Sequence, residues 1–317
     1  MTEGGKGRLT PKMALGLAAP HTWAASVTPV LLTGAIVYRE QGFLPVLLFL
    51  LLLCISILMQ SAVNTFNDYY DMIRGNDSAD DAVEASDAVL VYNDIPPRRA
   101  LRLGFMFLLA AALLAVYPVW HGGIGVLLTG LAGAAIILLY SAGPVPLSHL
   151  PVGELVSGFV MGSLIPLGCY AAMTGRMRFS VMLDTLPVAF GIAMIMMTNN
   201  TCDIEKDIPS GRKTLPVLLG RSRALLLYRA LLFVWISVTA VWIVRSLPYM
   251  GSLIPRRIPM PALALIIFCT GLALVAGQFR MIRDALRRPA LMKRVSLITL
   301  LFGLSLTLAS CAGRAAV

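Results

Sequence analysis

The chain has 317 residues, of which 58% are hydrophobic and only 13% are charged, and its mean hydropathy is +0.80. These values exclude an ordinary soluble domain and indicate a protein that crosses a membrane several times. The formal net charge is +10 at pH 7, and a basic surface facing anionic lipid accounts for it without a nucleic-acid partner.

Nine apolar stretches follow a polar N-terminal segment, residues 1–12. A membrane-spanning helix needs about 20 mainly apolar residues. We therefore predict an all-α, polytopic membrane protein that forms one domain over residues 1–317 and keeps its N-terminal segment, which is unlike a cleaved secretory signal. The predicted spans are roughly residues 13–38, 42–74, 98–118, 122–140, 151–174, 180–206, 224–245, 260–277 and 294–312.

The basic residues lie mainly on one side of this topology. With spans that alternate in direction, 18 of the 26 Lys and Arg residues fall in the N-terminal segment and in the loops after the second, sixth and eighth spans. Because cytoplasmic loops of membrane proteins carry an excess of Lys and Arg, we expect these loops in the cytoplasm. The predicted location is the cytoplasmic (plasma) membrane, with the site described next facing the cytoplasm.

The second predicted span ends in an acidic sequence, Asn64-Thr-Phe-Asn67-Asp68-Tyr-Tyr-Asp71. Asn64, Asp68 and Asp71 are spaced to share one face of a helix. Carboxylates at membrane depth are costly unless a cation, a proton path or a charged substrate stabilises them. The loop that follows, roughly 75–97, is long, polar and rich in Asp, which is typical of either a cap over a site or a solvated connection.

Two residues near the fourth and fifth spans are candidates for a functional role. Tyr140 ends the fourth span, where a tyrosine at the membrane interface is the ordinary structural role. Glu154 opens the fifth span, where it either favours the helix N-terminus or binds a substrate. The three histidines lack partners at helical spacing and the five cysteines lack paired spacing, so we assign them interfacial and packing roles.

The sixth predicted span ends in a second acidic sequence, Asn199-Asn200-Thr-Cys-Asp203-Ile-Glu205-Lys-Asp207. Asn199, Asp203 and Asp207 are likewise spaced to share one face of a helix. Such columns of oxygen ligands suit Mg²⁺, which binds through one or two carboxylates, waters and substrate phosphate oxygens. Local ion pairs would explain either cluster alone, but two matched clusters on one side of the membrane predict a magnesium and diphosphate site.

Basic residues stand directly beyond both clusters. Arg74, Arg212 and Lys213 are placed to hold phosphate oxygens that a metal does not. The segment Gly211-Arg-Lys-Thr is not a P-loop, because position 207 is Asp where that motif requires glycine. The alternative of another class is an ion- or proton-coupled transporter, which favours acids near the bilayer midplane rather than at helix ends.

These segments resemble the UbiA superfamily of intramembrane aromatic prenyltransferases. The resemblance depends on Asn64-x-x-x-Asp68-x-x-Asp71 and Asp203-x-x-x-Asp207, which match the two Asp-rich motifs of the family. Pro20-His-Thr-Trp, Tyr140-Ser-Ala-Gly-Pro and Gly153-Glu are similar to the branch that uses 1,4-dihydroxy-2-naphthoate. The matching blocks cover most of the chain, from its first predicted span to the loop after the sixth.

The resemblance implies nine helices around a central cavity that opens sideways to lipid. A polyprenyl diphosphate would lie there with its tail in the membrane, and its prenyl group would pass to an aromatic acceptor in a Mg²⁺-dependent reaction. The implied acceptor is 1,4-dihydroxy-2-naphthoate, which would lose its carboxylate in a step of menaquinone biosynthesis. Acceptors of the 4-hydroxybenzoate or homogentisate type are the alternative.

The resemblance also implies roles for individual residues. The implied Mg²⁺ ligands are Asn64, Asp68, Asp71, Asn199, Asp203 and Asp207, with Asn200 as a further secondary ligand. The diphosphate contacts are Asn67, Arg74, Arg212 and Lys213. The catalytic residues are Asp68, Asp203, Tyr140 and Lys213, with Tyr140 close to the allylic carbon.

The loop after the first acidic sequence departs from the family pattern. It reads Gly75-Asn-Asp-Ser and contains no arginine before Arg98, whereas the family pattern continues with Gly-x-Asp-Thr and a basic segment. This departure leaves the acceptor less constrained than the type of reaction.

Overall fold

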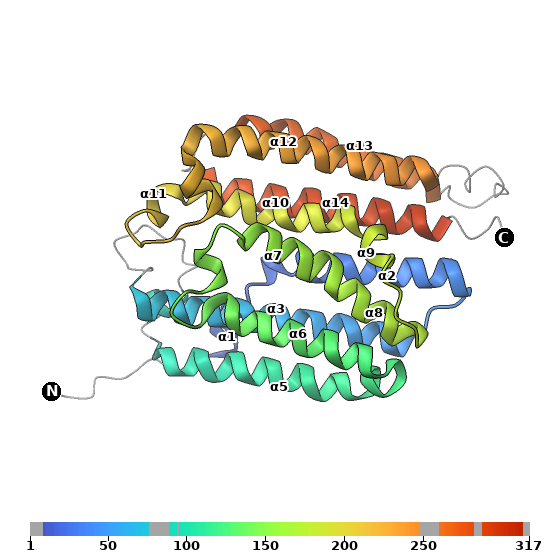
Figure 1. Ribbon diagram of the computed structural model, residues 1–317, viewed down its shortest axis with the longest axis horizontal. Helices are drawn as coiled ribbons and strands as arrows, with labels where there is room; N and C mark the ends of the chain where they lie inside the picture. Colours follow the sequence, from blue (N-terminus) through green and yellow to red (C-terminus); the bar gives the residue numbers. More distant parts are fainter. Residues whose placement is uncertain (1–8, 76–88, 94, 247–259, 282–286, 313–317) are drawn as a thin grey trace.

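The computed structural model describes residues 9–75, 89–93, 95–246, 260–281 and 287–312. Every regular element in these ranges is a helix, which confirms the predicted all-α class. The long helices run side by side along the length of the molecule (Figure 1). They are α2 (Ala24–Gln41), α3 (Val46–Arg74), α5 (Pro97–Gly122), α6 (Ile124–Ser141), α10 (Leu186–Cys202), α12 (Leu215–Ser246), α13 (Met260–Met281) and α14 (Arg288–Ala312).

One further rod is made of three helical pieces. The helices α7 (Gly153–Phe159) and α8 (Ile165–Thr174) are joined by a π-helical turn, Val160–Leu164. With this rod, seven of the described helices are long and apolar enough to cross a membrane. The helices α2 and α10, which are not among these seven, lie parallel to them in Figure 1. Counting both as spans gives nine, and that count remains a prediction.

The first predicted span, 13–38, is wrong at its beginning. The structure divides this stretch into α1 (Pro11–Ala18), a short 3-10 turn (Pro20–Thr22) and α2. Ala19 between them has a left-handed backbone with φ of 47°, and Pro20 disfavours helical geometry in the residue before it. The short α1 packs through Leu17 against Leu90 of α4 (Val89–Tyr92), so it covers one end of the bundle instead of extending α2.

The sixth predicted span, 180–206, is also divided. The structure has α9 (Val181–Asp184), then α10, then the single turn α11 (Ile204–Asp207). Asp203 separates the last two with φ of −94° and ψ of 9°, outside the α-helical region. The spacing of Asn199, Asp203 and Asp207 predicted one continuous helix through all three. That prediction is wrong, because the helix is interrupted at Asp203.

The α7–α8 rod and α10 approach each other very closely. A Cβ atom added to Gly162 would lie 2.2 Å from the Cα atom of Ala189, and one added to Gly158 would lie 2.9 Å from the carbonyl oxygen of Ala189. Neither glycine can be replaced without moving the helices apart. This glycine seam, Gly158 and Gly162 against Ala189, sets the distance between two walls of the cavity described below.

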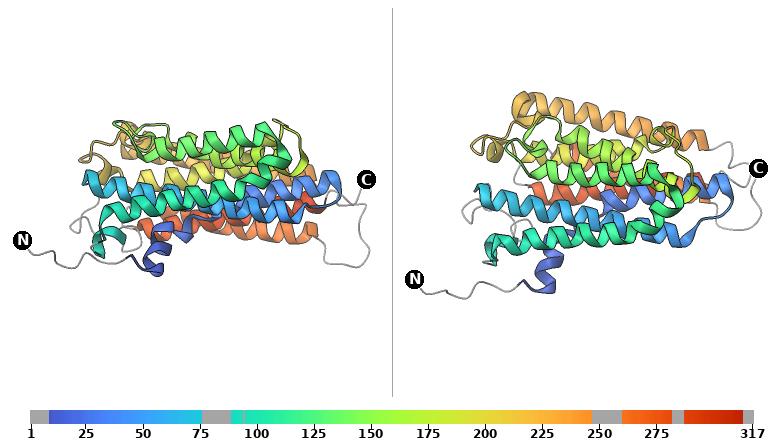
Figure 2. Two further views of the ribbon diagram at one scale, coloured as in Figure 1. Left: turned by 90° about the horizontal axis from the view of Figure 1, so that it is seen from below. Right: turned by 60° about the horizontal axis from the view of Figure 1, so that its bottom comes forward.

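The ends of α3 and α10 that carry the two acidic sequences lie at the same end of the bundle (Figures 1 and 2). The helices α5 and α14 begin at that end. All five cysteines are free in this structure.

Candidate functional site

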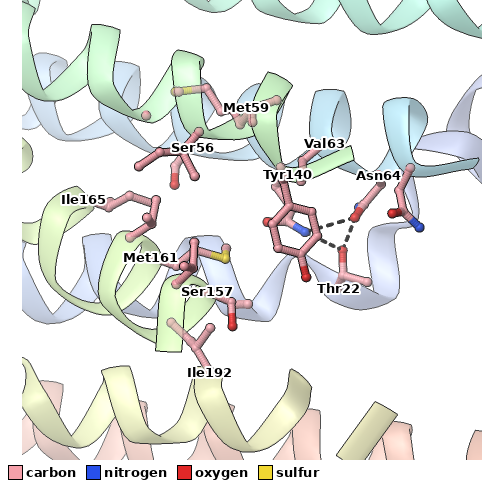
Figure 3. A pocket seen from close by; sticks show the side chains of 18 of the residues that line it. Thr22, Ser56, Met59, Val63, Asn64, Tyr140, Ser157, Met161, Ile165 and Ile192 are labelled. Atoms are coloured by element: carbon pink, nitrogen blue, oxygen red, sulfur yellow. Dashed lines mark hydrogen bonds between the residues drawn. The ribbon is translucent and has the colours of Figure 1, made fainter. Parts of the chain in front are cut away.

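A cavity of about 1910 Å³ lies between the helices. Along α3 its lining extends from Leu52 to Asp71, a rise of about 28 Å at 1.5 Å per residue, which is close to the thickness of a bilayer's hydrocarbon core. Apolar side chains such as Met59, Met161 and Ile165 line its length, and Tyr140 and Asn64 lie further toward one end (Figure 3). The cavity therefore joins a long apolar channel to a polar end.

Most of the residues predicted for the site line this cavity. They are Asn64, Asn67, Asp68, Asp71, Tyr140, Asn199, Asn200, Asp203 and Arg212. Arg74, Asp207 and Lys213 are not among the described residues of the lining. Part of the predicted cap loop, residues 76–88 and 94, lies outside the described residues.

The first acidic motif, Asn64, Asn67, Asp68 and Asp71, belongs to the last turns of α3. The Nδ2 atom of Asn64 donates to the carbonyl oxygen of Ala18 at 3.0 Å and to the Thr22 hydroxyl at 2.9 Å. Its Oδ1 atom accepts from Gln60 at 3.1 Å. The bent N-terminal segment thus fixes the side chain of Asn64, as Figure 3 shows.

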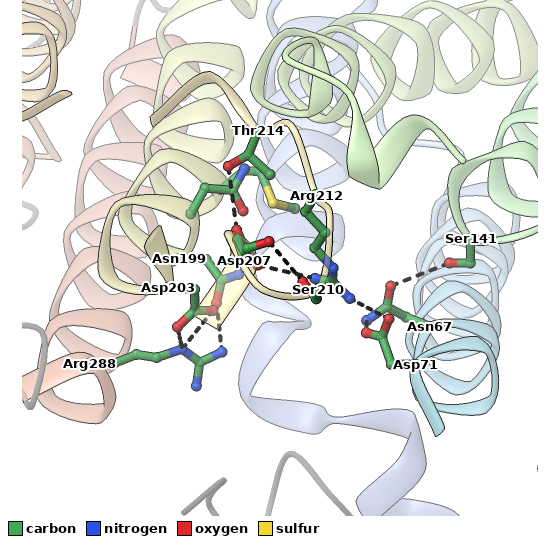
Figure 4. A network of polar contacts seen from close by, with 12 residues as sticks. Asn67, Asp71, Ser141, Asn199, Asp203, Asp207, Ser210, Arg212, Thr214 and Arg288 are labelled. Carbon is green, nitrogen blue, oxygen red and sulfur yellow. Dashed lines mark hydrogen bonds and ion pairs between the residues drawn. The ribbon is translucent and has the colours of Figure 1, made fainter. Parts of the chain in front are cut away.

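Asp71, at the end of this motif, is buried and held from two sides. Its Oδ2 accepts from the Asn67 amide at 3.0 Å, and its Oδ1 pairs with the guanidinium of Arg212. The Asn67 oxygen in turn faces the Ser141 hydroxyl at 3.4 Å. Arg212 comes from the segment after α11, so this pair ties the first motif to the second (Figure 4).

The second acidic motif, Asn199, Asp203 and Asp207, divides its residues between two places. Arg288, at the start of α14, donates to Asn199 Oδ1 at 2.7 Å, and its Nε lies 3.0 Å from an Asp203 oxygen. Asp207 is 2% exposed and accepts from the Thr214 hydroxyl at 3.3 Å, with Arg212 at 3.8 Å. Burial raises the pKa of Asp207 to about 6, which Arg212 opposes.

The predicted basic residues are separated in the same way. Arg212 lies within the polar end, between Asp71 and Asp207. Arg74 donates to the Gly143 carbonyl at 2.9 Å and stacks on the Tyr70 ring. Lys213 has an exposed side chain, and its backbone N–H donates to the carbonyl of His149 at 2.9 Å.

Arg288 is a site residue that the sequence analysis did not single out. It lay among the basic residues of the loop before the last span, which were interpreted only as determinants of topology. The structure begins α14 six residues before the predicted span, and its first two turns enter the cavity lining with Arg288 and Lys293. Thr22 and Gln60, which hold Asn64, were missed because their contacts depend on the bend at Ala19.

The polar end fits a divalent cation only together with a substrate. The described residues contain no group of three or more His, Cys, Asp or Glu side chains close enough to hold a metal. They do offer Asp68, Asp71 and Asp203 on one cavity, with arginines against two of these carboxylates. Mg²⁺ binds well to one or two carboxylates when substrate phosphate oxygens complete its shell, so the donor set fits that arrangement.

Comparison with known proteins agrees with this geometry. The model of the UbiA prenyltransferase family matches residues 26–297. The 1,4-dihydroxy-2-naphthoate octaprenyltransferase of Bacillus subtilis is 35% identical over 77% of this chain and 78% of its own length. A mouse UbiA prenyltransferase domain-containing protein is 32% identical over 68% of this chain and 63% of its own length.

Solved structures share the fold. A UbiA homologue from Archaeoglobus fulgidus, bound to GPP and Mg²⁺, superposes with a TM-score of 0.59 at 18% identity, covering 93% of this chain and 99% of that one. A ligand-free homologue from Aeropyrum pernix gives a TM-score of 0.57 at 18% identity, covering 86% and 94%. The match of the family model over most of the chain and the identity to the Bacillus protein together show that this integral membrane protein belongs to the UbiA prenyltransferase family.

Proposed function

We propose that this enzyme transfers a polyprenyl group from a polyprenyl diphosphate to 1,4-dihydroxy-2-naphthoate, with loss of the acceptor's carboxylate. The family match and the identity to the Bacillus octaprenyltransferase support prenyl transfer to an aromatic ring. The observation that carries the proposal is the shape of the cavity, because both acidic motifs lie at the polar end of an apolar channel about as long as a bilayer core is thick. A diphosphate with a long hydrocarbon tail has the same two parts.

We propose Mg²⁺ as the cofactor, held by oxygens of the two acidic motifs. Asn64, Asp68, Asp71, Asn199 and Asp203 line the cavity and are the ligands that need the least rearrangement. Asp207 could join them only if the segment with Arg212 and Thr214 moved, because both contact it in this structure. When bound, the metal would neutralise charge on the departing diphosphate.

The guanidinium groups of Arg212 and Arg288 are proposed to bind the diphosphate. Both lie on the cavity and already contact carboxylates or amides of the motifs. Arginine holds phosphate oxygens through several N–H donors in a fixed geometry, which stabilises the charge that develops as the allylic C–O bond breaks. Arg74 and Lys213 remain predicted diphosphate contacts, although neither is among the described residues that line the cavity.

The channel itself protects the allylic cation. Its apolar walls exclude water that would otherwise react with the carbocation. The ring of Tyr140, which lies in the cavity (Figure 3), can stabilise a nearby cation through its face. The electron-rich acceptor ring then forms the new C–C bond, and the carboxylate leaves as CO₂ with its bonding electrons returned to the ring.

We further propose that the chain is a single UbiA-like domain in the plasma membrane, with the polar end of the cavity facing the cytoplasm. The asymmetry of Lys and Arg supports this orientation, since 18 of 26 fall on the side of the acidic motifs.

An assay of the purified protein in vesicles, with a labelled polyprenyl diphosphate and a panel of aromatic acceptors, tests the function. We expect dihydroxynaphthoate to be prenylated and decarboxylated, and 4-hydroxybenzoate to be poorer by roughly 10²-fold or more in kcat/KM. Mass spectrometry identifies the product. A prenylated hydroxybenzoate as the main product, or a naphthoate that keeps its carboxylate, would refute the acceptor assignment.

A further inference from the structure

A buried polar pair lies beside the cavity, between α7 and α10. Glu154 at the start of α7 and Asn200 near the end of α10 are each 7% exposed. The Nδ2 atom of Asn200 donates to Glu154 Oε1 at 2.9 Å. Two side chains 46 positions apart in the sequence are thus joined, and this contact differs from the role of secondary metal ligand that the family resemblance implied for Asn200.

Glu154 determines which way the Asn200 amide points. A carboxylate oxygen accepts hydrogen bonds, so only the NH₂ group of the amide can face it. The amide oxygen is therefore turned elsewhere, and it accepts no hydrogen bond from the described residues. Because Asn200 is part of the cavity lining, this fixed orientation offers an acceptor atom to whatever binds there.

The other oxygen of Glu154 is also without a partner. Oε2 is buried and has no hydrogen bond within the described part of the chain. Glu154 is not itself among the described residues of the cavity lining, but it is hydrogen-bonded to Asn200, which is. Because leaving a buried acceptor unpaired costs free energy, this oxygen beside the lining indicates that a donor arrives with a ligand. The pair thus has two unmatched acceptor atoms.

Asn200 lies near the Tyr140 hydroxyl. Met196, one helical turn before Asn200, has its sulfur 3.4 Å from that hydroxyl. A Cβ atom added to Gly153 would lie 3.9 Å from the Tyr140 hydroxyl and 4.0 Å from Asn200 Nδ2. Gly153, Tyr140 and Asn200 therefore border one small space at the beginning of α7.

Neighbouring residues of α10 face different partners. Asn199 binds Arg288 of α14, whereas Asn200 binds Glu154 of α7. Successive residues of a helix point about 100° apart, so the diphosphate side and this side meet at adjacent faces of α10. A ring held beside Asn200 would lie next to a prenyl group whose diphosphate is held beside Asn199.

We propose that Asn200 binds a phenolic hydroxyl of the aromatic acceptor and that Glu154 is the positioning residue that orients its amide. The inference depends on the proposed function and specifies where its acceptor binds. A site made of an amide oxygen and a carboxylate suits an O–H donor and repels anions, so it selects the hydroxyl of the ring rather than its carboxylate. The Tyr140 hydroxyl is near enough to border the same ring.

The test compares dihydroxynaphthoate with its two monomethyl ethers, which lack one hydroxyl donor each. Wild-type protein should bind one ether at least about tenfold more weakly than the parent compound, measured as Kd by calorimetry and as KM in the assay. We call the Kd of this ether divided by the Kd of the parent compound the ether ratio. In Asn200→Ala the ether ratio should fall to about three or less, while the KM for the polyprenyl diphosphate should stay within about twofold of the wild-type value.

Asn199→Ala is the matched control from the next position of the helix. It should raise the KM for the polyprenyl diphosphate and leave the ether ratio as in the wild type. Glu154→Gln should shrink the ether ratio partly, because a glutamine amide no longer forces one orientation on Asn200, and this variant decides the question if Asn200→Ala does not fold.

The proposal is overturned if Asn200→Ala and Glu154→Gln both keep the wild-type ratio for both ethers, or if Asn200→Ala raises the KM for the diphosphate as Asn199→Ala does. The second result would make Asn200 a residue of the metal and diphosphate site. Failure of the proposed function is recognised separately, because the wild-type protein would then prenylate no aromatic acceptor in the panel.

Discussion

The two acidic motifs have similar spacing in the sequence and different geometry in the structure. The first lies on one uninterrupted helix, so Asn64, Asp68 and Asp71 all reach the cavity. The second is interrupted at Asp203, so Asp203 reaches the cavity and Asp207 is buried under the segment that carries Thr214. Spacing alone therefore predicts which residues share a site only while the helix continues.

The largest expected effect concerns Asp68 and Asp203, which we expect to have the same role, metal binding, in the two motifs. Asp68→Ala and Asp203→Ala should each lower kcat by about 10³-fold or more, because a lost metal ligand removes several kcal/mol of leaving-group stabilisation. Chelation with EDTA should do the same to the wild-type protein and be reversed by Mg²⁺. Near-normal turnover in EDTA, with both variants folded, would rule out the metal-dependent mechanism.

The arginines provide the next comparison, because one contacts each motif. Arg212→Ala and Arg288→Ala should each raise the KM for the polyprenyl diphosphate by roughly tenfold, the effect of losing a hydrogen bond to a charged group. Arg287→Ala is the control for Arg288→Ala, because Arg287 is the exposed neighbour of Arg288 and is not among the described residues that line the cavity. Lys213→Ala is compared with Arg212→Ala, and an equal effect of both would show that the side chain outside the cavity also reaches the substrate.

Asp207 tests the asymmetry of the motifs directly. Asp207→Asn should destabilise the protein by about 1–3 kcal/mol, since it weakens the buried contacts with Arg212 and Thr214, and thermal unfolding in detergent measures this. The Mg²⁺ concentration for half-maximal activity should rise less than in Asp203→Asn. An equal rise in both variants would mean that the segment after α11 rearranges and brings Asp207 to the metal.

The last comparison has the smallest effect on the enzyme, because it tests only which end of the bundle faces the cytoplasm. Ser222→Cys near the start of α12 and Arg176→Cys after α8 place single exposed thiols at opposite ends of the bundle, in a background without the native cysteines. An impermeant reagent added to intact cells should label position 176 and leave position 222 unlabelled until the cells are opened. The reverse pattern would place both acidic motifs outside the cell.

The sequence was informative where local rules act without interruption. The apolar run and the spacing of Asn64, Asp68 and Asp71 predicted both the helix α3 and the face it presents. The family resemblance implied a role beside the allylic carbon for Tyr140. The structure places Tyr140 on the same cavity as Asn199, which the spacing had already singled out. The acidic residues at helix ends also separated an enzyme from a transporter correctly, as the family membership shows.

The missed features depend on contacts between distant segments. The bend at Ala19 is visible in retrospect from Pro20, but its consequence, Thr22 and Ala18 holding Asn64, needs the fold. The break at Asp203 has no proline or glycine to announce it. Arg288 looked like one more positive charge beside the membrane, because only the packing of α14 against α10 brings it to Asp203.

The glycine seam divides the enzyme into a stiff part and a part that can exchange partners. Gly158 and Gly162 already touch Ala189, so the α7–α8 rod cannot move closer to α10. The part of the cavity wall that carries Glu154 and Asn200 is therefore rigid. By contrast, Arg212 and Arg288 are long side chains that can release carboxylates and take phosphate oxygens without moving a helix. The aromatic acceptor would therefore meet a preformed wall, and the diphosphate a wall whose side chains can adapt. Variants that alter the cavity at the glycine seam should change which aromatic rings are accepted before they change which diphosphates bind.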